Sequence, residues 1–219
     1  MIKHRLFIAF AITSLCGMMS SWGRTNTTAE DSTLVEIDST EIIAEQEARA
    51  AKEAESAEKA KERQELIATL SKNFNEKKDE FSEKIWVKPT NCPKYRNRNA
   101  TYCYFMKVGN EVSNFRFVLQ YENDKWLFIK DLIFNIDGTN YGYRGLNFET
   151  DCGNGGRIWE WCDLQFNDVS LIKALENAKS VKIKMNGRQY YDIRTLSSKD
   201  LTSIQNTIKY YKALGGKFN

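Results

Sequence analysis

The stretch VKIKMNGRQYYDIR, residues 181–194, shows the pattern that decides the fold of the C-terminal part of the chain. Apolar and basic side chains alternate from Val181 to Met185, and an Asn-Gly dipeptide then separates this run from a second one. Two such runs around Asn-Gly predict an antiparallel hairpin. The spacing places Lys182 and Lys184 on one strand face, with Arg188 and Arg194 on the opposing run.

Similar short runs precede the hairpin. They cover residues 85–87, 100–108, 112–121, 125–136, 141–148 and 157–162, with turn residues between them. Capping residues at 167–168 and 197–198 predict two helices, the second of which ends before Gly215. This order predicts an α+β domain over residues 85–219, built as a small antiparallel β-sheet or partial barrel with two packed helices.

Residues 41–84 are predicted to form a long N-terminal charged helix ahead of this domain, after a flexible tether over residues 24–40. The helical segment is rich in Ala, Glu and Lys and contains no Gly, Pro or Cys. No large apolar residue occurs over residues 44–64, so this part is expected to be exposed. Near its C-terminal end, the segment has four apolar residues at helical spacing that form one apolar seam: Ile67, Leu70, Phe74 and Phe81. The seam either docks on the domain or joins a second helix in a coiled coil, which would make a homo-oligomer.

The two parts of the chain carry opposite charge. Residues 29–84 hold 16 acidic and 9 basic side chains, whereas residues 85–219 hold 13 acidic and 20 basic ones. A whole-chain charge of +3 conceals this asymmetry. The basic domain predicts an anionic partner, either an anionic envelope polymer or an envelope protein.

Residues 1–23 read as a secretory signal peptide. A basic head, an apolar run from Leu6 to Met19 and a tail of small residues make up this pattern. Cys16 follows the apolar run, where a lipoprotein carries its lipid, but Thr13 and Leu15 match a lipobox only loosely. Lipidation at Cys16 and ordinary cleavage near Cys16 or Gly23 both remain open, so the chain is periplasmic, lipid-anchored or secreted.

The remaining cysteines suggest a disulfide framework. Cys92 and Cys103 are 11 residues apart, and Cys152 and Cys162 are 10 apart. An even number of cysteines in an exported chain predicts the pairs Cys92–Cys103 and Cys152–Cys162, although two other connectivities remain.

The composition excludes several chemistries. The only histidine, His4, lies in the predicted leader, so the mature chain has no Ser-His-Asp triad, Cys-His pair or His-ligated zinc. The cysteines lack zinc spacing, and the glycines at 153–156 lack the spacing of a phosphate-binding loop. No metal or other cofactor is expected. Export argues against a nucleic-acid partner, and any membrane contact would be made through the lipid anchor alone.

Trp159 and Trp161 are the most distinctive candidates for ligand binding. Alternation places both on one strand face, where they would stack a sugar ring or pack in the core beside Cys162. Around them, four acids suggest a carboxylate-based hydrolase of cell-wall glycan: Glu149, Asp151, Glu160 and Asp163. Two turns rich in Asp and Asn are further candidates, as calcium sites: Asp151 with Asn154, and Asn135 with Asp137 and Asn140. The favoured reading is an exported, non-catalytic binding or scaffold module of the bacterial envelope, and the hydrolase is the alternative.

Overall fold

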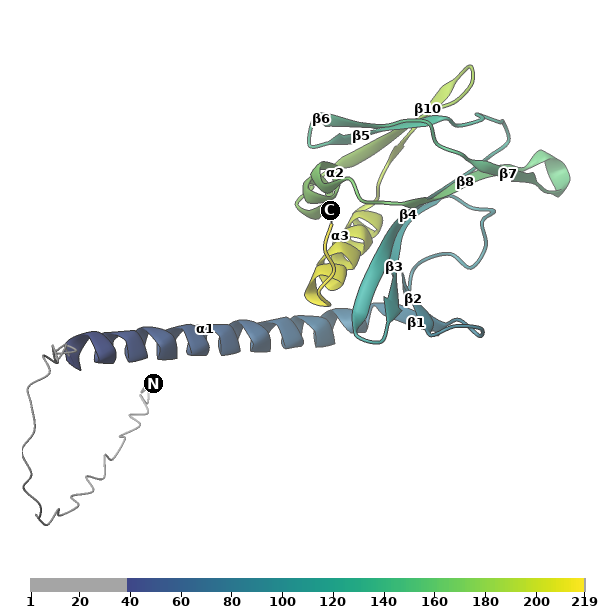
Figure 1. Cartoon of the computed structure of the whole chain (residues 1–219). Coiled ribbons are helices and arrows are strands. Elements are labelled where there is room, and N and C mark those ends of the chain that lie inside the picture. Colours follow the sequence, from purple (N-terminus) through teal and green to yellow (C-terminus); the bar gives the residue numbers. More distant parts are fainter. Residues whose placement is uncertain (1–38, 219) are drawn as a thin grey trace, which may run out of the picture. The chain divides into compact units, whose positions relative to one another are not determined.

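The computed structural model describes residues 39–218, with side chains from residue 43 onward. The chain divides into two units, residues 1–47 and 48–219, and only helical residues 39–47 are described in the first. The predicted leader, most of the tether, and Cys16 lie outside the described residues. The described part is α+β, with three α-helices and two antiparallel sheets (Figure 1).

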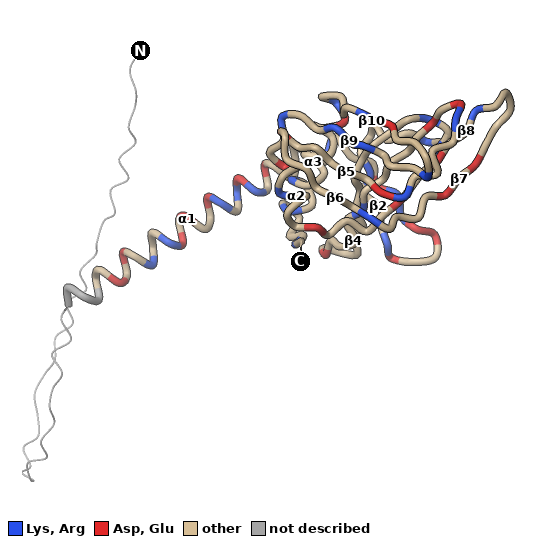
Figure 2. Tube along the Cα trace, turned by 90° about the horizontal axis from the view of Figure 1, so that it is seen from above, with Lys and Arg blue, Asp and Glu red and all other residues tan. Residues whose placement is uncertain are grey.

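Helix α1 spans Ser39–Ser71. Basic and acidic residues are interspersed along it (Figure 2), and two pairs lie one turn apart, Arg49 with Glu53 at 3.1 Å and Lys59 with Glu55 at 2.5 Å. Each such exposed pair adds only about 0.2–0.5 kcal/mol to helix stability. Residues 43–66 are all exposed, and the predicted exposure of residues 44–64, which lack large apolar side chains, is thereby confirmed. None of the described helices combines the length and the apolar character that a membrane crossing requires.

The helix ends at Ser71, so its predicted continuation to Lys84 is wrong. Strand β1 (Phe74–Lys78) follows and pairs with β2. Leu70 is buried in the domain core, and Phe74 stacks on Tyr210 with ring centroids 4.8 Å apart. Phe81 is 97% exposed and belongs to no apolar seam. The docking alternative therefore holds for the last helical turn, while Phe74 reaches the core from a strand.

The strands form two separate sheets rather than a barrel. The first, sheet A, has the order β1-β2-β3-β4-β8-β7, and the second, sheet B, has the order β10-β9-β5-β6. Sheet A consists of β1, β2 (Lys84–Pro89), β3 (Ala100–Val108), β4 (Glu111–Asn123), β7 (Glu149–Cys152) and β8 (Ile158–Gln165). Sheet B consists of β5 (Asp131–Ile136), β6 (Thr139–Tyr143), β9 (Val181–Asn186) and β10 (Tyr191–Thr195). A short 3-10 turn, η1 (Asn154–Gly156), joins β7 to β8.

Two helices complete the domain. Helix α3 (Ser198–Ala213) packs on β3, and α2 (Val169–Glu176) packs on α3 (Figure 1). The side chains of Asp168 and Ser197 cap them by accepting bonds from Leu171 N–H (3.0 Å) and Asp200 N–H (3.1 Å), which confirms the predicted starts. One core cluster joins the inner faces of both sheets to α2 and α3.

The predicted hairpin is confirmed, but the strand predicted over residues 125–136 is shorter than expected. Asn186 pairs with Tyr191 across the β9–β10 turn. Residues 125–130, predicted to begin a long strand, are irregular, and β5 starts only at Asp131. The reason is tertiary: the backbone N–H groups of residues 127–129 bond to the side chain of Glu160 instead of to a neighbouring strand.

Candidate functional site

The side chains of strand β8 alternate between the two faces of sheet A. Ile158 and Cys162 belong to the core, whereas Trp159, Trp161 and Asp163 alternate with them on the outer face. The two indoles therefore share one face, as predicted, and they do not pack in the core beside Cys162. Trp161 is buried on that outer face, and Trp159 is half-buried.

A cavity of about 410 Å³ opens beside the two indoles, and we call it the indole cavity. Its lining comes from the loop before β3 and from the β7–β8 hairpin: Tyr95, Arg96, Asn97, Asp151, Trp159 and Trp161. The volume lies in the range of small-ligand pockets, about 300–1,000 Å³. Aromatic faces together with an amide, a carboxylate and a guanidinium suit a ligand that offers both C–H faces and polar groups.

Arg96 covers part of this site. Its guanidinium carbon lies 4.8 Å from the centre of the Trp161 ring, and its Nη1 lies 3.6 Å from Glu149 Oε2. Trp159 instead packs against the backbone of the hairpin, where a Cβ added to Gly153 would lie 3.1 Å from its ring. Trp159 and Tyr95, which is largely exposed, therefore offer the accessible aromatic surface.

Trp161, which lines the cavity, and its cross-strand neighbour Gln120 each carry a buried polar atom without a partner within residues 39–218. Trp161 Nε1 and Gln120 Oε1 have no hydrogen-bond partner among the described residues, and their residues are paired directly across β8 and β4. Buried polar atoms normally have a partner, so these two are exceptions that call for an explanation. A hydroxyl group or a water molecule, which both donates and accepts, is the group that would satisfy the pair.

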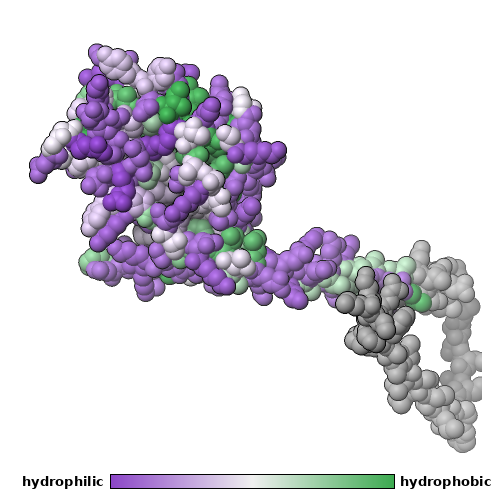
Figure 3. Space-filling view, turned by 180° about the vertical axis from the view of Figure 1, so that it is seen from behind, coloured by the Kyte–Doolittle hydropathy of each residue, from purple (hydrophilic) through white to green (hydrophobic). Residues whose placement is uncertain are grey.

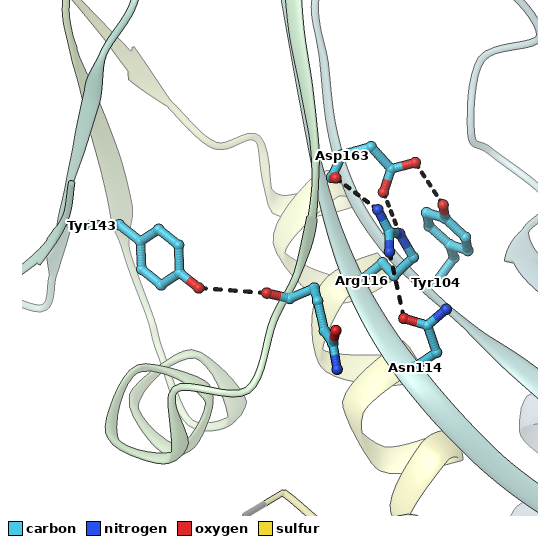
Figure 4. Close-up of polar contacts among 6 residues, drawn as sticks. Tyr104, Asn114, Arg116, Tyr143 and Asp163 are labelled. Carbon is cyan, nitrogen blue, oxygen red and sulfur yellow. Dashed lines mark hydrogen bonds and ion pairs between the residues drawn. The ribbon is translucent and has the colours of Figure 1, made fainter. Parts of the chain in front are cut away.

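A polar network occupies the neighbouring part of the outer face (Figure 4). Arg116 Nε donates to Asp163 Oδ1 at 2.6 Å, and the Tyr104 hydroxyl donates to Asp163 Oδ2 at 2.6 Å. Burial and the bond to Asp163 raise the pKa of Tyr104, and burial raises that of Tyr102 to about 12. Burial opposes the charge of Arg116, but the bond to Asp163 raises its pKa overall. Both tyrosines stay neutral donors at physiological pH, and Asp163 is fully engaged.

The four acids proposed for a hydrolase are not gathered in one cleft. Glu160 is fully buried and accepts bonds from Leu127 N–H (2.7 Å), Phe128 N–H (2.9 Å) and Ile129 N–H (2.8 Å). Asp163 lies on the other face of β8, and Glu149 is paired with Arg96. Of the four, only Asp151 lines the indole cavity.

The candidate calcium turns are used in local structure. Asp137 accepts bonds from Lys179 N–H and Ser180 N–H at 2.8–3.1 Å, and the side chains of Asn135 and Asn140 bond to each other at 2.7 Å. Asp151 accepts a bond from Cys152 N–H at 2.8 Å. Across residues 39–218, no three His, Cys, Asp or Glu side chains form a group that fits a metal ion.

The four basic candidates of the hairpin are placed differently from one another. Lys182 is exposed, Lys184 Nζ lies 4.1 Å from the centre of the Tyr191 ring, and the Arg188 guanidinium lies 5.3 Å from that of Phe128. Arg194 reaches across to sheet A, where its Nη1 donates to Gln120 O at 2.9 Å. It also bonds three groups before and in β3: Ala100 O, Thr101 Oγ1 and Asn99 Oδ1. Burial lowers the pKa of Arg194. Arg194 therefore links the two sheets and is not available to a ligand.

All four described cysteines are free thiols, and neither predicted pair is brought together. Cys103 lies in the core, whereas Cys92 packs with Tyr102 and Tyr104 on the opposite face of sheet A. Cys152 on β7 is paired with Ile158 on β8. Ile158 is four residues before Cys162 along β8, so Cys152 and Cys162 are separated by four residues of strand. At about 3.3 Å per residue this separation exceeds the reach of a disulfide.

We expect these thiols to react in two classes. Cys152 is exposed and should alkylate first at pH 8, followed by Cys92, whose pKa burial raises. Burial also raises the pKa of Cys103 and brings that of Cys162 to about 12, so both should react only in denaturant. Iodoacetamide labelling with peptide mapping measures this order. Thiols that stay unreactive in denaturant until a reductant is added would contradict the free state. Four free thiols would also weaken the argument for export, because exported chains meet oxidising conditions.

Several residues of the site carry no local sequence signal. Arg96 and Asn97 lie in a turn-rich loop more than sixty positions before Trp159, and only the pairing of β3, β4 and β8 brings them together. The run of Lys94, Arg96 and Arg98 around Tyr95 was the one available hint, and it marks a basic loop without showing what the loop covers. No protein-family model matches the sequence, and neither a curated protein nor a solved structure is similar to it.

Proposed function

We propose that this protein is an exported, non-catalytic binding module of the bacterial envelope that holds an anionic glycan in the indole cavity. The observation that carries the proposal is the make-up of this cavity, with two aromatic rings, Tyr95 and Trp159, beside the polar side chains of Arg96, Asn97 and Asp151. Sugar rings have apolar C–H faces that stack on aromatic rings and hydroxyl groups that bond to amides, carboxylates and guanidinium groups.

Charge supports an anionic glycan over a neutral one. The loop over the cavity carries Lys94, Arg96 and Arg98, and all three side chains are exposed. The only carboxylate in the lining, Asp151, is already bonded to Cys152 N–H. A uronate or a phosphorylated sugar would meet this excess of positive charge.

The acid arrangement favours binding over hydrolysis. Glycoside hydrolysis needs two carboxyl groups on either side of the scissile bond, about 5–10 Å apart. Glu160 points to the core side of β8, Asp163 is held by Arg116 and Tyr104, and Glu149 is held by Arg96. The hydrolase alternative therefore lacks a second free acid in the indole cavity.

The rest of the chain suits delivery and spacing. The leader over residues 1–23 and the choice between lipidation at Cys16 and release assign the protein to the envelope. The charged helix, which is exposed over residues 43–66, suits a spacer between an anchor and the domain or a contact with a second copy. These roles of the N-terminal part belong to the same proposal.

The proposal predicts that Trp159→Ala weakens glycan binding at least tenfold, because loss of an aromatic anchor from a binding site costs about 2 kcal/mol or more. Calorimetric titration with uronic-acid oligosaccharides and neutral cell-wall oligosaccharides at 0.1 M and 1 M salt measures this. Phe81→Ala is the matched control, because it removes a 97% exposed ring in the turn between β1 and β2, and β1 lies at the opposite edge of sheet A from β7. Arg96→Gln should lower the affinity for the acidic sugars and remove most of its salt dependence.

Two outcomes would contradict the proposal. Equal binding by wild type and Trp159→Ala would place the ligand elsewhere. New reducing ends accumulating during long incubation would favour the hydrolase instead.

A further inference from the structure

A second exposed surface lies on sheet B, apart from the indole cavity. Four large apolar side chains are exposed on the β9–β10 hairpin and on the segment 127–129 that its turn contacts: Phe128 (44%), Tyr190 (71%), Tyr191 (60%) and Ile193 (52%). Lys184 and Arg188 lie over two of these rings. We call these six residues the hairpin patch. Figure 3 shows hydrophobic groups gathered near the top of the domain, the end that sheet B occupies in Figure 1.

The backbone of the hairpin patch is strained at Phe128. Phe128 has φ = 53°, a left-handed conformation that a bulky residue rarely adopts. The buried carboxylate of Glu160 holds it there by accepting the N–H groups of Leu127, Phe128 and Ile129. A strained backbone, stabilised from below and used to expose an aromatic ring, is typical of a binding surface.

The hairpin is fitted closely against this segment. Arg188 N–H donates to Leu127 O at 2.9 Å, and a Cβ on Gly187 would lie only 2.0 Å from that oxygen. Trp126 stacks on Phe128 with centroids 5.4 Å apart and rings inclined by 12°. Phe128 is therefore positioned by the contacts on both sides of it, although almost half of its surface remains exposed.

The basic side chains of the hairpin patch favour an acidic partner. In the part of the chain that the structure describes, neither Lys184 nor Arg188 forms an ion pair with a carboxylate, and each lies over a ring instead. Two further exposed lysines lie nearby: Lys182 on β9, two residues before Lys184, and Lys130 directly after residues 127–129. The nearby acid Asp131 accepts a bond from Gly145 N–H, and Asp192 accepts one from Ile193 N–H. The patch thus presents two basic side chains, Lys184 and Arg188, that form no ion pair with the described carboxylates and lie over apolar groups.

We propose that the hairpin patch binds an extended acidic segment of a partner protein. The acidic side chains would meet Lys184 and Arg188, and the apolar ones would cover Phe128 and Ile193. A glycan would suit the rings but provides no apolar side chain for Ile193. β10 is also the outermost strand of sheet B, so an extended peptide can lie along it. This proposal does not depend on the glycan site.

Phe128 provides the sharpest test. Phe128→Gly relieves the left-handed backbone but removes the ring and its stack on Trp126, so these effects should offset one another and change the melting temperature little. The same change should weaken peptide binding about tenfold, as loss of an aromatic anchor does. Phe81→Gly removes an exposed ring elsewhere and should leave binding unchanged. A clear fall in the melting temperature of Phe128→Gly would show that Phe128 is structural and would overturn the inference.

The probe is a fluorescein-labelled (Glu-Leu)5 peptide, measured by fluorescence anisotropy on the full chain. We expect saturable binding that Arg188→Glu weakens about tenfold, while Lys209→Glu, a charge reversal on α3, has little effect. A (Lys-Leu)5 peptide should not bind, and a decamer of Glu should bind much more weakly than (Glu-Leu)5. Equal binding of the Glu decamer, or Phe128-dependent binding of anionic vesicles or acidic polysaccharide without peptide binding, would overturn the proposal.

Discussion

Glu160→Gln is expected to lower the free energy of unfolding by about 3 kcal/mol, and Glu160→Ala by about 5 kcal/mol. The carboxylate is fully buried and is the acceptor for three consecutive N–H groups. Gln keeps one acceptor oxygen but turns an NH2 group toward a backbone donor. Ala leaves all three N–H groups buried without a partner and adds a void. Urea unfolding followed by Trp fluorescence measures both values.

The matched control is Asp163→Asn, because Asp163 also lies on β8 but is part-buried on the outer face. It should cost less than Glu160→Gln. Hydrogen exchange should accelerate at Leu127, Phe128 and Ile129 in Glu160→Gln before the rest of the domain opens. A cost below about 1 kcal/mol for Glu160→Ala would show that these N–H groups find other partners.

Gly187→Ala should lower the free energy of unfolding by about 2–3 kcal/mol. The added Cβ would lie 2.0 Å from Leu127 O, and this neighbour is backbone that no side-chain rotation can move aside. The hairpin would have to move away, which breaks the 2.9 Å bond from Arg188 N–H to the same oxygen. Thermal unfolding measures the loss, and the melting temperature should drop by several degrees.

Gly142→Ala is the control for this substitution. Gly142 lies in edge strand β6, has no left-handed φ, and has nothing within 4 Å of an added Cβ. Ala there should be neutral or stabilise by up to about 1 kcal/mol, because it restricts the unfolded chain. If the two variants behave alike, the close approach at Gly187 is not maintained in solution.

Several strands and both helix starts of the domain were accessible from sequence because their signals act over a few residues, whereas β1, β7 and the end of the predicted strand 141–148 were not. Alternation at Val181–Met185 and the Asn-Gly turn predicted the β9–β10 hairpin, and the hydroxyl and carboxylate caps at Ser197 and Asp168 predicted two helix starts. The seam through Phe74 and Phe81 failed because helical spacing recurs by chance in a short segment. Phe74 is instead drawn into a strand by its contact with Tyr210.

The candidate site was accessible only in part. The pairing of Trp159 with Trp161 on one face follows from strand periodicity alone. The positions of Arg96 and Arg194 do not follow from local periodicity. A loop that covers β8 places Arg96 over Trp161, and carbonyl groups of the other sheet bind the guanidinium of Arg194. Lys184 and Arg194 look alike in sequence, but one points to solvent over Tyr191 and the other lies between the sheets.

By itself, the sequence determined that the C-terminal part is an α+β domain with antiparallel strands, that residues 44–64 stay exposed, and that the two indoles share a face. These features depend on periodicity and capping, which neighbouring residues decide. The tertiary structure decided the split into two sheets, the conformation of residues 125–130 and the exposure of Phe128. Each depends on a contact such as that of Glu160 with N–H groups 31–33 residues away, and no local pattern encodes such a contact because burial alone selects it.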